Sequence, residues 1–212
     1  MAEPPHQDPH QDTVSDGREP LPPGKVAELV ARSGFVQYEP GRSLLEEDIL
    51  VFVAGTKSDW PSCTITNQFG QPIGSTYKEK ARWPIVIPEI GMRAGSSGEL
   101  LRVRPRSSYV ISGIADGSYK PAVLGGGFEI ETREGELVGS VSGTNMSRKI
   151  WDHNAETVGG IEMFDAYEGF GDHRQDHVLW LHPSLTGPAR FLMMAAPLVI
   201  VLMDWAQRKG QR

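Results

Sequence analysis

The segment Phe191–Met203 reads FLMMAAPLVIVLM, thirteen consecutive residues without a polar side chain. Pro188 precedes it and suits the first turn of a helix, and Arg208 and Lys209 follow it with the cations that are common where helices end. The sequence therefore predicts a C-terminal helix over about residues 188–208. Because this helix is apolar on every face, it must be surrounded on every face.

A membrane is one possible surrounding for this helix, and enclosure by protein is the other. The apolar segment spans about 20 Å as a helix, whereas the hydrocarbon core of a bilayer is about 30 Å thick. A longer span buries Arg190 at one end and Asp204 at the other, each at a cost of roughly 2.5–3.5 kcal/mol in lipid. Pro197 lacks an N–H and is expected to kink the helix. We therefore expect the helix to be enclosed by protein; the alternative is a membrane anchor.

Composition predicts one folded domain behind a tail. Residues 1–25 are rich in Pro and Asp and predict a disordered tail, and residues 26–212 predict the folded domain. Cys63 is the only cysteine, and no apolar leader is visible at the N-terminus, so we expect a cytoplasmic protein. The net charge is −6, of which about half belongs to the tail, so we expect no nucleic-acid partner.

Apart from a short helical turn around Val26–Val30, the folded part reads as strands. Ile49–Val53 is apolar at every position, which is typical of a strand buried on both faces. A hairpin pattern then occurs three times: a strand, a polar turn, and two small residues at fixed spacing before the next strand. The first small residue needs a positive φ in the turn, and the second marks a bend or a close backbone approach. The frames are Gly70-x-x-Ile73-Gly74, Gly135-x-x-Val138-Gly139 and Ala155-x-x-Val158-Gly159.

These hairpins have the form Asn/Asp-x-x-Gly-x-x-aliphatic-Gly between two strands, and an apolar helix ending in Asp204-Trp205 follows them. In this combination the chain resembles the phospholipid scramblase-like and LURP-one-related proteins of the tubby C-terminal-like superfamily, over roughly residues 40–208. The resemblance implies a closed antiparallel β-barrel of about twelve strands that encloses the C-terminal helix. Tubby proteins bind phosphoinositides through basic residues on the barrel, so the resemblance also implies binding of anionic lipid.

The chain departs from the scramblases in ways that bear on activity. Those proteins carry a Cys-rich stretch before the barrel and a proposed Ca²⁺-binding segment before the final helix. Here the corresponding segment has Asp165, Glu168, Asp172 and Asp176 without the ligand spacing of a Ca²⁺ loop. We therefore predict no calcium dependence and no other cofactor, and we do not expect scrambling activity.

Basic side chains recur at every second position in two stretches, the spacing that places them on one face of a strand. We expect both faces to point outward and together to bind anionic phospholipid headgroups. The alternative is an ordinary solvated surface on which the cations pair with Glu79, Glu99 or other acids. The two basic trios are Lys78, Lys80 and Arg82, and Arg102, Arg104 and Arg106.

The segment Asp172–His182 carries the enzymatic alternative. Its flanking glycines and the apolar run Val178–Leu181 predict a loop entering a strand, which does not preorganise metal ligands. We therefore predict a non-enzymatic protein that binds anionic phospholipid headgroups or a protein partner, with no catalytic or metal-binding residue; a metal-assisted enzyme is the alternative. The side chains of the type that bind zinc or iron are Asp172, His173, Asp176, His177 and His182.

Overall fold

The computed structural model shows three helices and twelve strands among the residues that it describes. The described residues are 24–35, 41, 43–55, 61–79, 88–95, 98–122, 127–144, 146–166 and 174–210. The first elements are α1 (Lys25–Ser33), β1 (Ile49–Ala54), β2 (Cys63–Asn67), β3 (Pro72–Lys78), β4 (Ile90–Ala94), β5 (Glu99–Pro105) and β6 (Tyr109–Gly113). The others are β7 (Gly117–Pro121), β8 (Phe128–Thr132), β9 (Leu137–Gly143), β10 (Ser147–Asp152), β11 (Thr157–Asp165), β12 (Gln175–Leu181), α2 (Gly187–Met194) and α3 (Ala196–Gly210).

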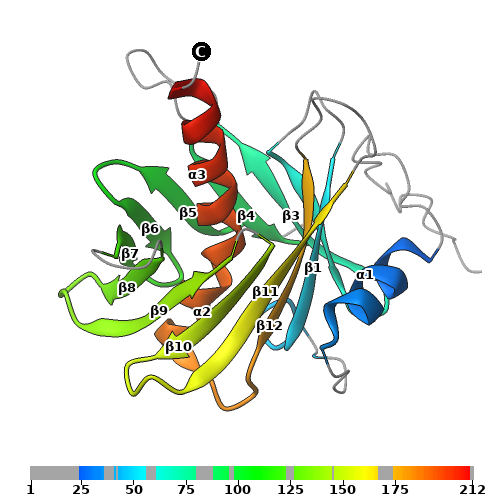
Figure 1. Ribbon diagram of the computed structural model, residues 1–212, viewed down its shortest axis with the longest axis horizontal. Coiled ribbons are helices and arrows are strands. Elements are labelled where there is room, and N and C mark those ends of the chain that lie inside the picture. Colours follow the sequence, from blue (N-terminus) through cyan, green and yellow to red (C-terminus); the bar gives the residue numbers. More distant parts are fainter. Residues whose placement is uncertain are drawn as a thin grey trace, which may run out of the picture.

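The twelve strands form one closed barrel (Figure 1). Consecutive strands are antiparallel neighbours from β1 to β12. The barrel closes at a seam between β1 and β12, where Ile49 lies opposite Trp180 and Phe52 lies opposite His177. The predicted closed antiparallel barrel of about twelve strands is therefore confirmed.

The C-terminal helix runs through the barrel in two segments, α2 and α3 (Figure 1). They are separated at Ala195, whose N–H bonds to the carbonyl of Leu192 at 3.1 Å. Pro197 is the second residue of α3, and because it lacks an N–H it cannot continue the hydrogen-bond ladder of α2 into α3; the helix expected to kink at this proline is broken beside it, at Ala195. Every residue from 192 to 200 is buried, and core side chains of the strands pack around them.

Length and composition alone would let this helix cross a membrane. Gly187–Gln207 is the one stretch of 21 residues in the described part of the chain that is long and apolar enough. However, 61% of its most apolar window is buried inside the protein. The core helix of a barrel satisfies the same test, and the burial identifies this helix as the core.

The first strand is buried on both faces because two different layers cover it. Leu50 and Phe52 pack into the core that contains α2 and α3. Ile49, Val51 and Val53 point outward and pack under α1, whose apolar side chains close the outer face of the seam. This arrangement confirms the predicted two-sided burial, and it confirms the predicted helical turn as part of α1. The covering side chains of α1 are Val26, Leu29 and Val30.

The three repeated hairpins share one turn geometry. In each, the first turn residue donates its N–H to the carbonyl four residues later and accepts the N–H of the residue three positions later. A β-bulge follows in every copy, which accommodates the extra residue. The first small residue of each repeat, which lies in the turn, has the predicted positive φ. One of these residues is an alanine, for which this conformation costs roughly 1–2 kcal/mol. These residues are Gly70 (φ 83°), Gly135 (φ 87°) and Ala155 (φ 60°).

The second glycine of each repeat is a point of close approach, also as predicted. A Cβ at Gly74 would overlap Leu44, and a Cβ at Gly159 would lie 2.6 Å from the Trp180 carbonyl oxygen. At Gly139 a Cβ would overlap the carbonyl of the neighbouring strand and lie 2.7 Å from Cε of Met193 in α2. Gly139 therefore allows the wall and the enclosed helix to approach each other, whereas Gly74 and Gly159 allow close approach within the wall and to Leu44.

Antiparallel pairing gives the barrel two distinct ends. We call the end at which α3 emerges the α3 rim, and the end at which α2 begins the α2 rim (Figure 1). The three repeated turns lie at the α2 rim, because β2, β8 and β10 end there. At the α3 rim the strands end or begin at Ala54, Cys63, Lys78, Ile90, Pro105, Tyr109, Pro121, Phe128, Gly143, Ser147, Asp165 and Gln175.

Candidate functional site

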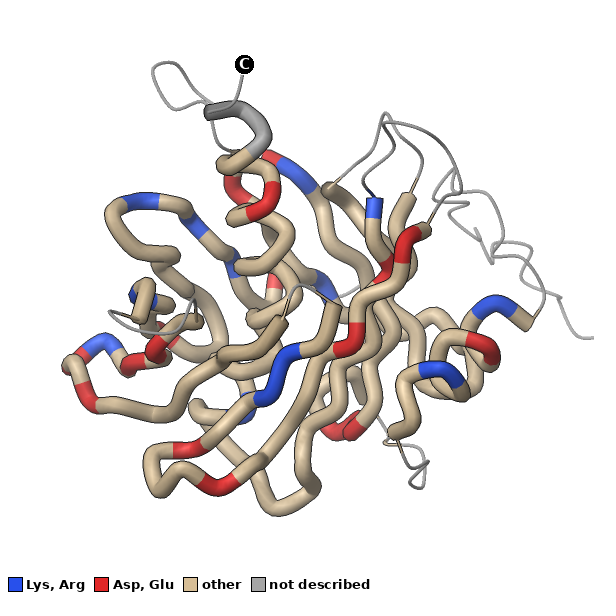
Figure 2. The backbone as a smooth tube through the Cα atoms, viewed as in Figure 1, with Lys and Arg blue, Asp and Glu red and all other residues tan. Residues whose placement is uncertain are grey.

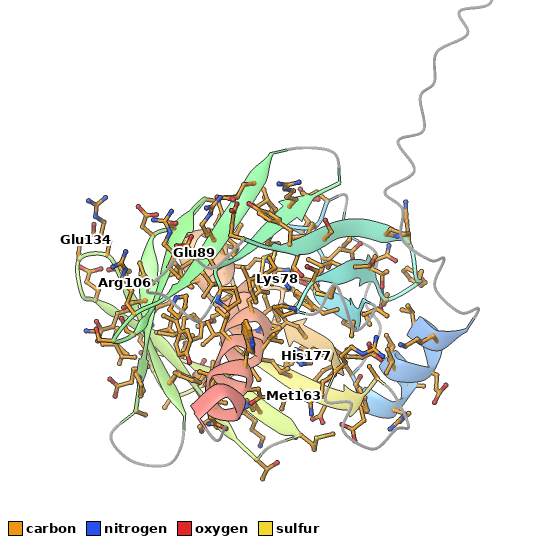
Figure 3. The ribbon with its side chains drawn as sticks, turned by 90° about the horizontal axis from the view of Figure 1, so that it is seen from above. Lys78, Glu89, Arg106, Glu134, Met163 and His177 are labelled. Carbon is orange, nitrogen blue, oxygen red and sulfur yellow. The ribbon has the colours of Figure 1, made fainter. Side chains whose placement is uncertain are left out.

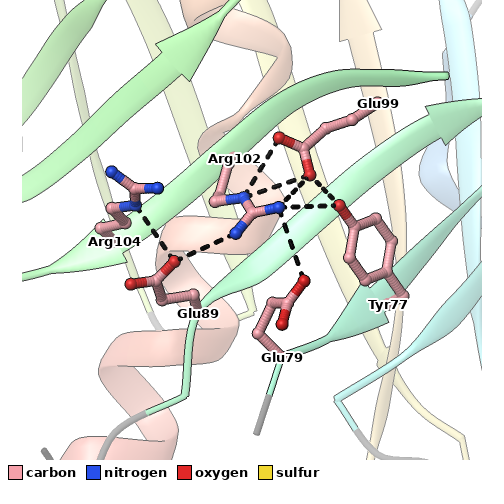
Figure 4. Close-up of polar contacts among 6 residues, drawn as sticks. All are labelled: Tyr77, Glu79, Glu89, Glu99, Arg102 and Arg104. Atoms are coloured by element: carbon pink, nitrogen blue, oxygen red, sulfur yellow. Dashed lines mark hydrogen bonds and ion pairs between the residues drawn. The ribbon is translucent and has the colours of Figure 1, made fainter. Parts of the chain in front are cut away.

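The outward face of β5 carries Arg102 at the centre of an acidic cluster (Figure 4). Its Nη2 lies 2.6 Å from Oε2 of Glu99 and its Nε donates to both oxygens of that carboxylate at 3.1 Å. Glu79 and Glu89 approach the same guanidinium at 3.5 Å. Hydrogen bonding to Glu99, and then the charges of all three acids, raise the pKa of Arg102 against the effect of desolvation. Arg102 is therefore a permanently charged group whose partners are already in place.

An aromatic ring completes this cluster. Tyr77, Gly91 and Arg102 lie side by side on β3, β4 and β5. A Cβ at Gly91 would overlap the Tyr77 ring, so the glycine lets the tyrosine cross β4 and donate its hydroxyl proton to Glu99. The guanidinium of Arg93 stacks over the same ring at 3.9 Å from its centre. Gly91 thus has a specific role in building the outer surface.

The predicted outward direction of the second basic trio holds for its strand residues. Leu101 and Val103 are buried in the core, so Arg102 and Arg104 alternate with them and point outward. Arg104 donates to Glu89 at 3.0 Å. With Arg93, the cluster therefore holds three carboxylates and three guanidinium groups, and its charges balance. Acidic and basic residues are likewise interspersed along the other strands (Figure 2). Arg102 thus pairs with Glu79 and Glu99, as in the alternative to headgroup binding, in which the basic residues form an ordinary solvated surface.

Lys78 occupies a different position from the one expected. It lies opposite Ile90, which lies opposite Val103, and both of these are core residues. Lys78 therefore stands on the inward side of the wall, exposed at the α3 rim, and the expectation that it shares an outward face with Arg102 was wrong. Figure 3 looks onto this rim and shows Lys78 and Arg106 apart from each other. Lys80 and Arg82 lie outside the described residues.

Asp176 and His177, two of the candidate metal ligands, are adjacent residues of β12, and their side chains point to opposite faces. Asp176 points outward, where its Oδ1 accepts the N–H of Ala54 at 2.8 Å and its Oδ2 lies 2.9 Å from Nζ of Lys25. His177 points inward between Phe52 and Met163 (Figure 3). Side chains on opposite faces of a strand cannot bind one ion, so a site using both residues is excluded. Asp172 and His173 lie outside the described residues.

The last histidine of that segment lies at the other end of the barrel. His182 follows β12 at the α2 rim, and its Nδ1 lies 2.7 Å from the hydroxyl of Ser184. Across the described ranges, no group of three or more His, Cys, Asp or Glu side chains is placed to hold a metal ion. The described part of the Asp172–His182 segment is therefore spread over two faces and both rims.

A narrow cavity lies inside the barrel near the α3 rim. Its volume is about 20 Å³, which is room for a water molecule. Cys63, Thr76 and His177 line one side, and Pro197, Leu198 and Val201 of α3 line the other. The Cys63 thiol lies 3.1 Å from the Thr76 hydroxyl. His177 is 2% exposed, and its Nε2 has no hydrogen-bond partner among the described residues.

A second buried polar group near this rim is Arg148, which the sequence reading overlooked. It lies opposite Ile161, which lies opposite the core residue Leu179, so its side chain points inward. Asp204 of α3 is close enough to influence the pKa of both Arg148 and Tyr109. The sequence Arg148-Lys149-Ile150 contained a signal for this buried charge. Successive side chains of a strand point to opposite faces, so one of two adjacent basic residues must face the core.

No family model, curated protein or solved structure matches this chain. The scramblase-like and LURP-one-related resemblance therefore remains a prediction. The structure shows the barrel and its enclosed helix, and a fold of this kind does not by itself specify a function.

The buried imidazole leads to a prediction about acid stability. Burial first, and then the charge of Arg148, lower the pKa of His177 from 6.5 to about 4. Between these values the unfolded chain binds more protons than the folded protein, so stability falls as the pH drops below about 6.5 and this loss is complete below about 4. We expect the contribution to reach about 3 kcal/mol.

Urea unfolding of the wild type and His177→Leu between neutral pH and about pH 4 measures this contribution. The variant lacks the proton-linked loss, so the stability difference between the two proteins should shift in the variant's favour as the medium is acidified. A difference that does not change with pH would show that His177 is not buried in its neutral form.

Proposed function

We propose that this protein is a non-enzymatic binder of anionic phospholipid headgroups that associates peripherally with the cytoplasmic face of a membrane through its α3 rim. The observation that carries the proposal is the composition of this rim. There α3 projects beyond the strands (Figure 1), and between Val201 and Gln207 its side chains other than Leu202 are at least partly exposed, Met203 and Trp205 among them. Lys78 and Arg106 lie at the same end of the barrel.

This combination suits the boundary between headgroups and acyl chains. Tryptophan favours that boundary because one end of its ring is apolar and the other carries an N–H donor. Each cation near an anionic membrane contributes about 1 kcal/mol. The sequence adds two further cations, Arg208 and Lys209, at the end of α3. By contrast, carboxylates already pair with the guanidinium groups of the outward cluster around Arg102, so this cluster offers an anionic surface little attraction.

The barrel also limits how the protein can associate. The apolar part of α2 and α3 is already in contact with the strands, so inserting it into lipid would empty the core. Binding through exposed charges and a helix tip is reversible and weakens as salt screens the charges. The proposal is therefore a peripheral, salt-sensitive association.

Liposome flotation tests the proposal with the double variant Lys78→Glu/Arg106→Glu. We expect the wild type to float with phosphatidylserine vesicles, to dissociate in high salt and to ignore phosphatidylcholine vesicles. Reversing two rim charges should weaken partitioning about 30-fold or more. The matched control is Arg133→Glu/Lys149→Glu, which changes the net charge equally at one exposed position at the α2 rim and one on the outward face of β10, and it should float like the wild type.

Three results would overturn the proposal. Flotation that resists carbonate would mean that the C-terminal helix inserts into the bilayer. Absence of flotation on anionic vesicles would leave a protein partner as the remaining prediction for the rim. Equal losses in the rim variant and in its control would show that net charge acts without a defined surface.

A further inference from the structure

Arg148 is a guanidinium placed where the alternation of β10 calls for an apolar side chain. It is 6% exposed, and the next inward residue along the strand, Ile150, is a core residue. Its Nε and Nη1 are buried without a hydrogen-bond partner. Among the described residues, the side chain of Arg148 makes no hydrogen bond or ion pair at all.

Asp204 lies close enough to Arg148 to influence its pKa, but the two side chains form no ion pair. Desolvation lowers the pKa of Arg148, and the negative charge of Asp204 partly offsets this effect. The nearby imidazole of His177 is neutral at physiological pH and has an unpartnered nitrogen of its own. Arg148 nevertheless stays charged, because an arginine does not release its proton in a protein.

A buried charge without acceptors is costly, and native proteins rarely leave one in that condition. An oxygen-bearing group that reaches the guanidinium would remove the cost. Arg148 is the second residue of β10, so it lies only about 3 Å along the strand from the residue at the α3 rim. A ligand held at that rim is therefore within reach of it.

The geometry points to Arg148 as the binding residue for the phosphate group of a ligand that enters the barrel at the α3 rim, between β10 and α3. This inference rests on the proposed function and specifies the headgroup chemistry. A guanidinium is suited to phosphate because its planar donors match the oxygen atoms and the bonds are charge-assisted. Asp204 sets a limit on affinity, because its carboxylate repels the incoming anion.

Calorimetric titration tests the site without a membrane. The full chain is titrated with inorganic phosphate at constant ionic strength. We expect saturable binding by the wild type and binding about tenfold or more weaker in Arg148→Met, which keeps an unbranched apolar stem but removes the guanidinium. Asp204→Asn removes the repulsion and should bind phosphate more tightly than the wild type. No saturable binding, or equal affinity in Arg148→Met, would overturn the inference and leave water as the partner of Arg148.

Asp204→Asn keeps the test decisive if Arg148→Met does not fold. Asp204 is only partly buried, so its amide variant is expected to fold. Phosphate affinity that is unchanged or weaker in Asp204→Asn would overturn the inference, because the carboxylate then does not face the bound anion.

Vesicles identify the source of the phosphate and separate this inference from the proposed function. A preference for phosphatidic acid over phosphatidylserine at equal charge, lost in Arg148→Met, would support a lipid phosphate monoester. Phosphate binding in solution without that preference would support a free or soluble phosphate. If Arg148→Met and the wild type show the same preference and the same phosphate affinity while both float on phosphatidylserine, the inference fails and the proposed function stands.

Discussion

Replacing Arg190 with methionine is expected to lower the free energy of unfolding by about 3–5 kcal/mol, the cost of breaking a buried ion pair. Arg190 lies in α2 near the α2 rim and is 6% exposed. Its Nη2 lies 3.1 Å from Oδ1 of Asp48 and donates to the carbonyl of Glu47 at 2.5 Å, while Nε donates to the carbonyl of Leu45 at 2.9 Å. These bonds tie the helix to the segment that leads into β1.

The size of this effect follows from the acceptors that the substitution leaves behind. Methionine fills much of the space but donates no hydrogen bond, so the carbonyls of Leu45 and Glu47 and the Asp48 carboxylate lose their partner together. For a domain of this size the loss corresponds to a drop of roughly 10 °C or more in the unfolding temperature.

Urea unfolding monitored by tryptophan fluorescence measures the loss. The matched control is Arg133→Met, which removes an arginine whose side chain is 77% exposed and should change stability by no more than about 0.5 kcal/mol. Asp48→Asn should cost less than Arg190→Met, because the carbonyl bonds to Arg190 remain. If Arg190→Met were as stable as the control, these contacts would not hold the helix in place.

A carboxylate at Val199 is expected to prevent the barrel from folding. Val199 is fully buried midway along the enclosed helix and belongs to the core that the strand side chains line. An unpaired carboxylate there costs several kcal/mol, and the displaced packing adds to that cost. The total is comparable to the whole stability of an ordinary domain, about 5–15 kcal/mol.

Soluble yield, thermal unfolding and limited proteolysis of Val199→Asp report this effect. Val199→Asn separates charge from polarity, because it has the same shape as the aspartate and should be less damaging. Gln207→Asp is the positional control, since Gln207 is exposed on the same helix and the variant should fold normally. A folded, protease-resistant Val199→Asp protein would mean that the helix is not enclosed by the strands.

The parts of the fold that the sequence predicted are those with local causes. Pro197 falls inside the apolar run, where a proline interrupts a helix because it lacks an N–H. The turns of the repeated hairpins need a positive φ at one position, and the chain marks two of the three with glycine. The apolar run of the helix required enclosure, and closing the sheet into a barrel satisfies that requirement without exposed strand edges.

The parts of the site that the sequence did not predict depend on which face of a strand points inward. In β5, Leu101 and Val103 fix the orientation, so Arg102 was correctly expected to point outward. In β3, the sequence PIGSTYK has no such alternation, and the buried position falls on Thr76, which turns Lys78 inward. Glu89 was missed as a partner of Arg102 because the contact depends on the pairing of β4 with β5.

The seam between β1 and β12 also determines when this protein can acquire its structure. It joins residues from opposite ends of the folded chain, and every other strand lies between them in sequence. During synthesis the strands emerge long before the helix that fills them, so the nascent sheet has an empty interior and two unpaired edges. Closure must wait until β12 and the helix after it have left the ribosome. Long-range pairing of this kind is slow, and it leaves the incomplete barrel exposed to aggregation until its last segment arrives.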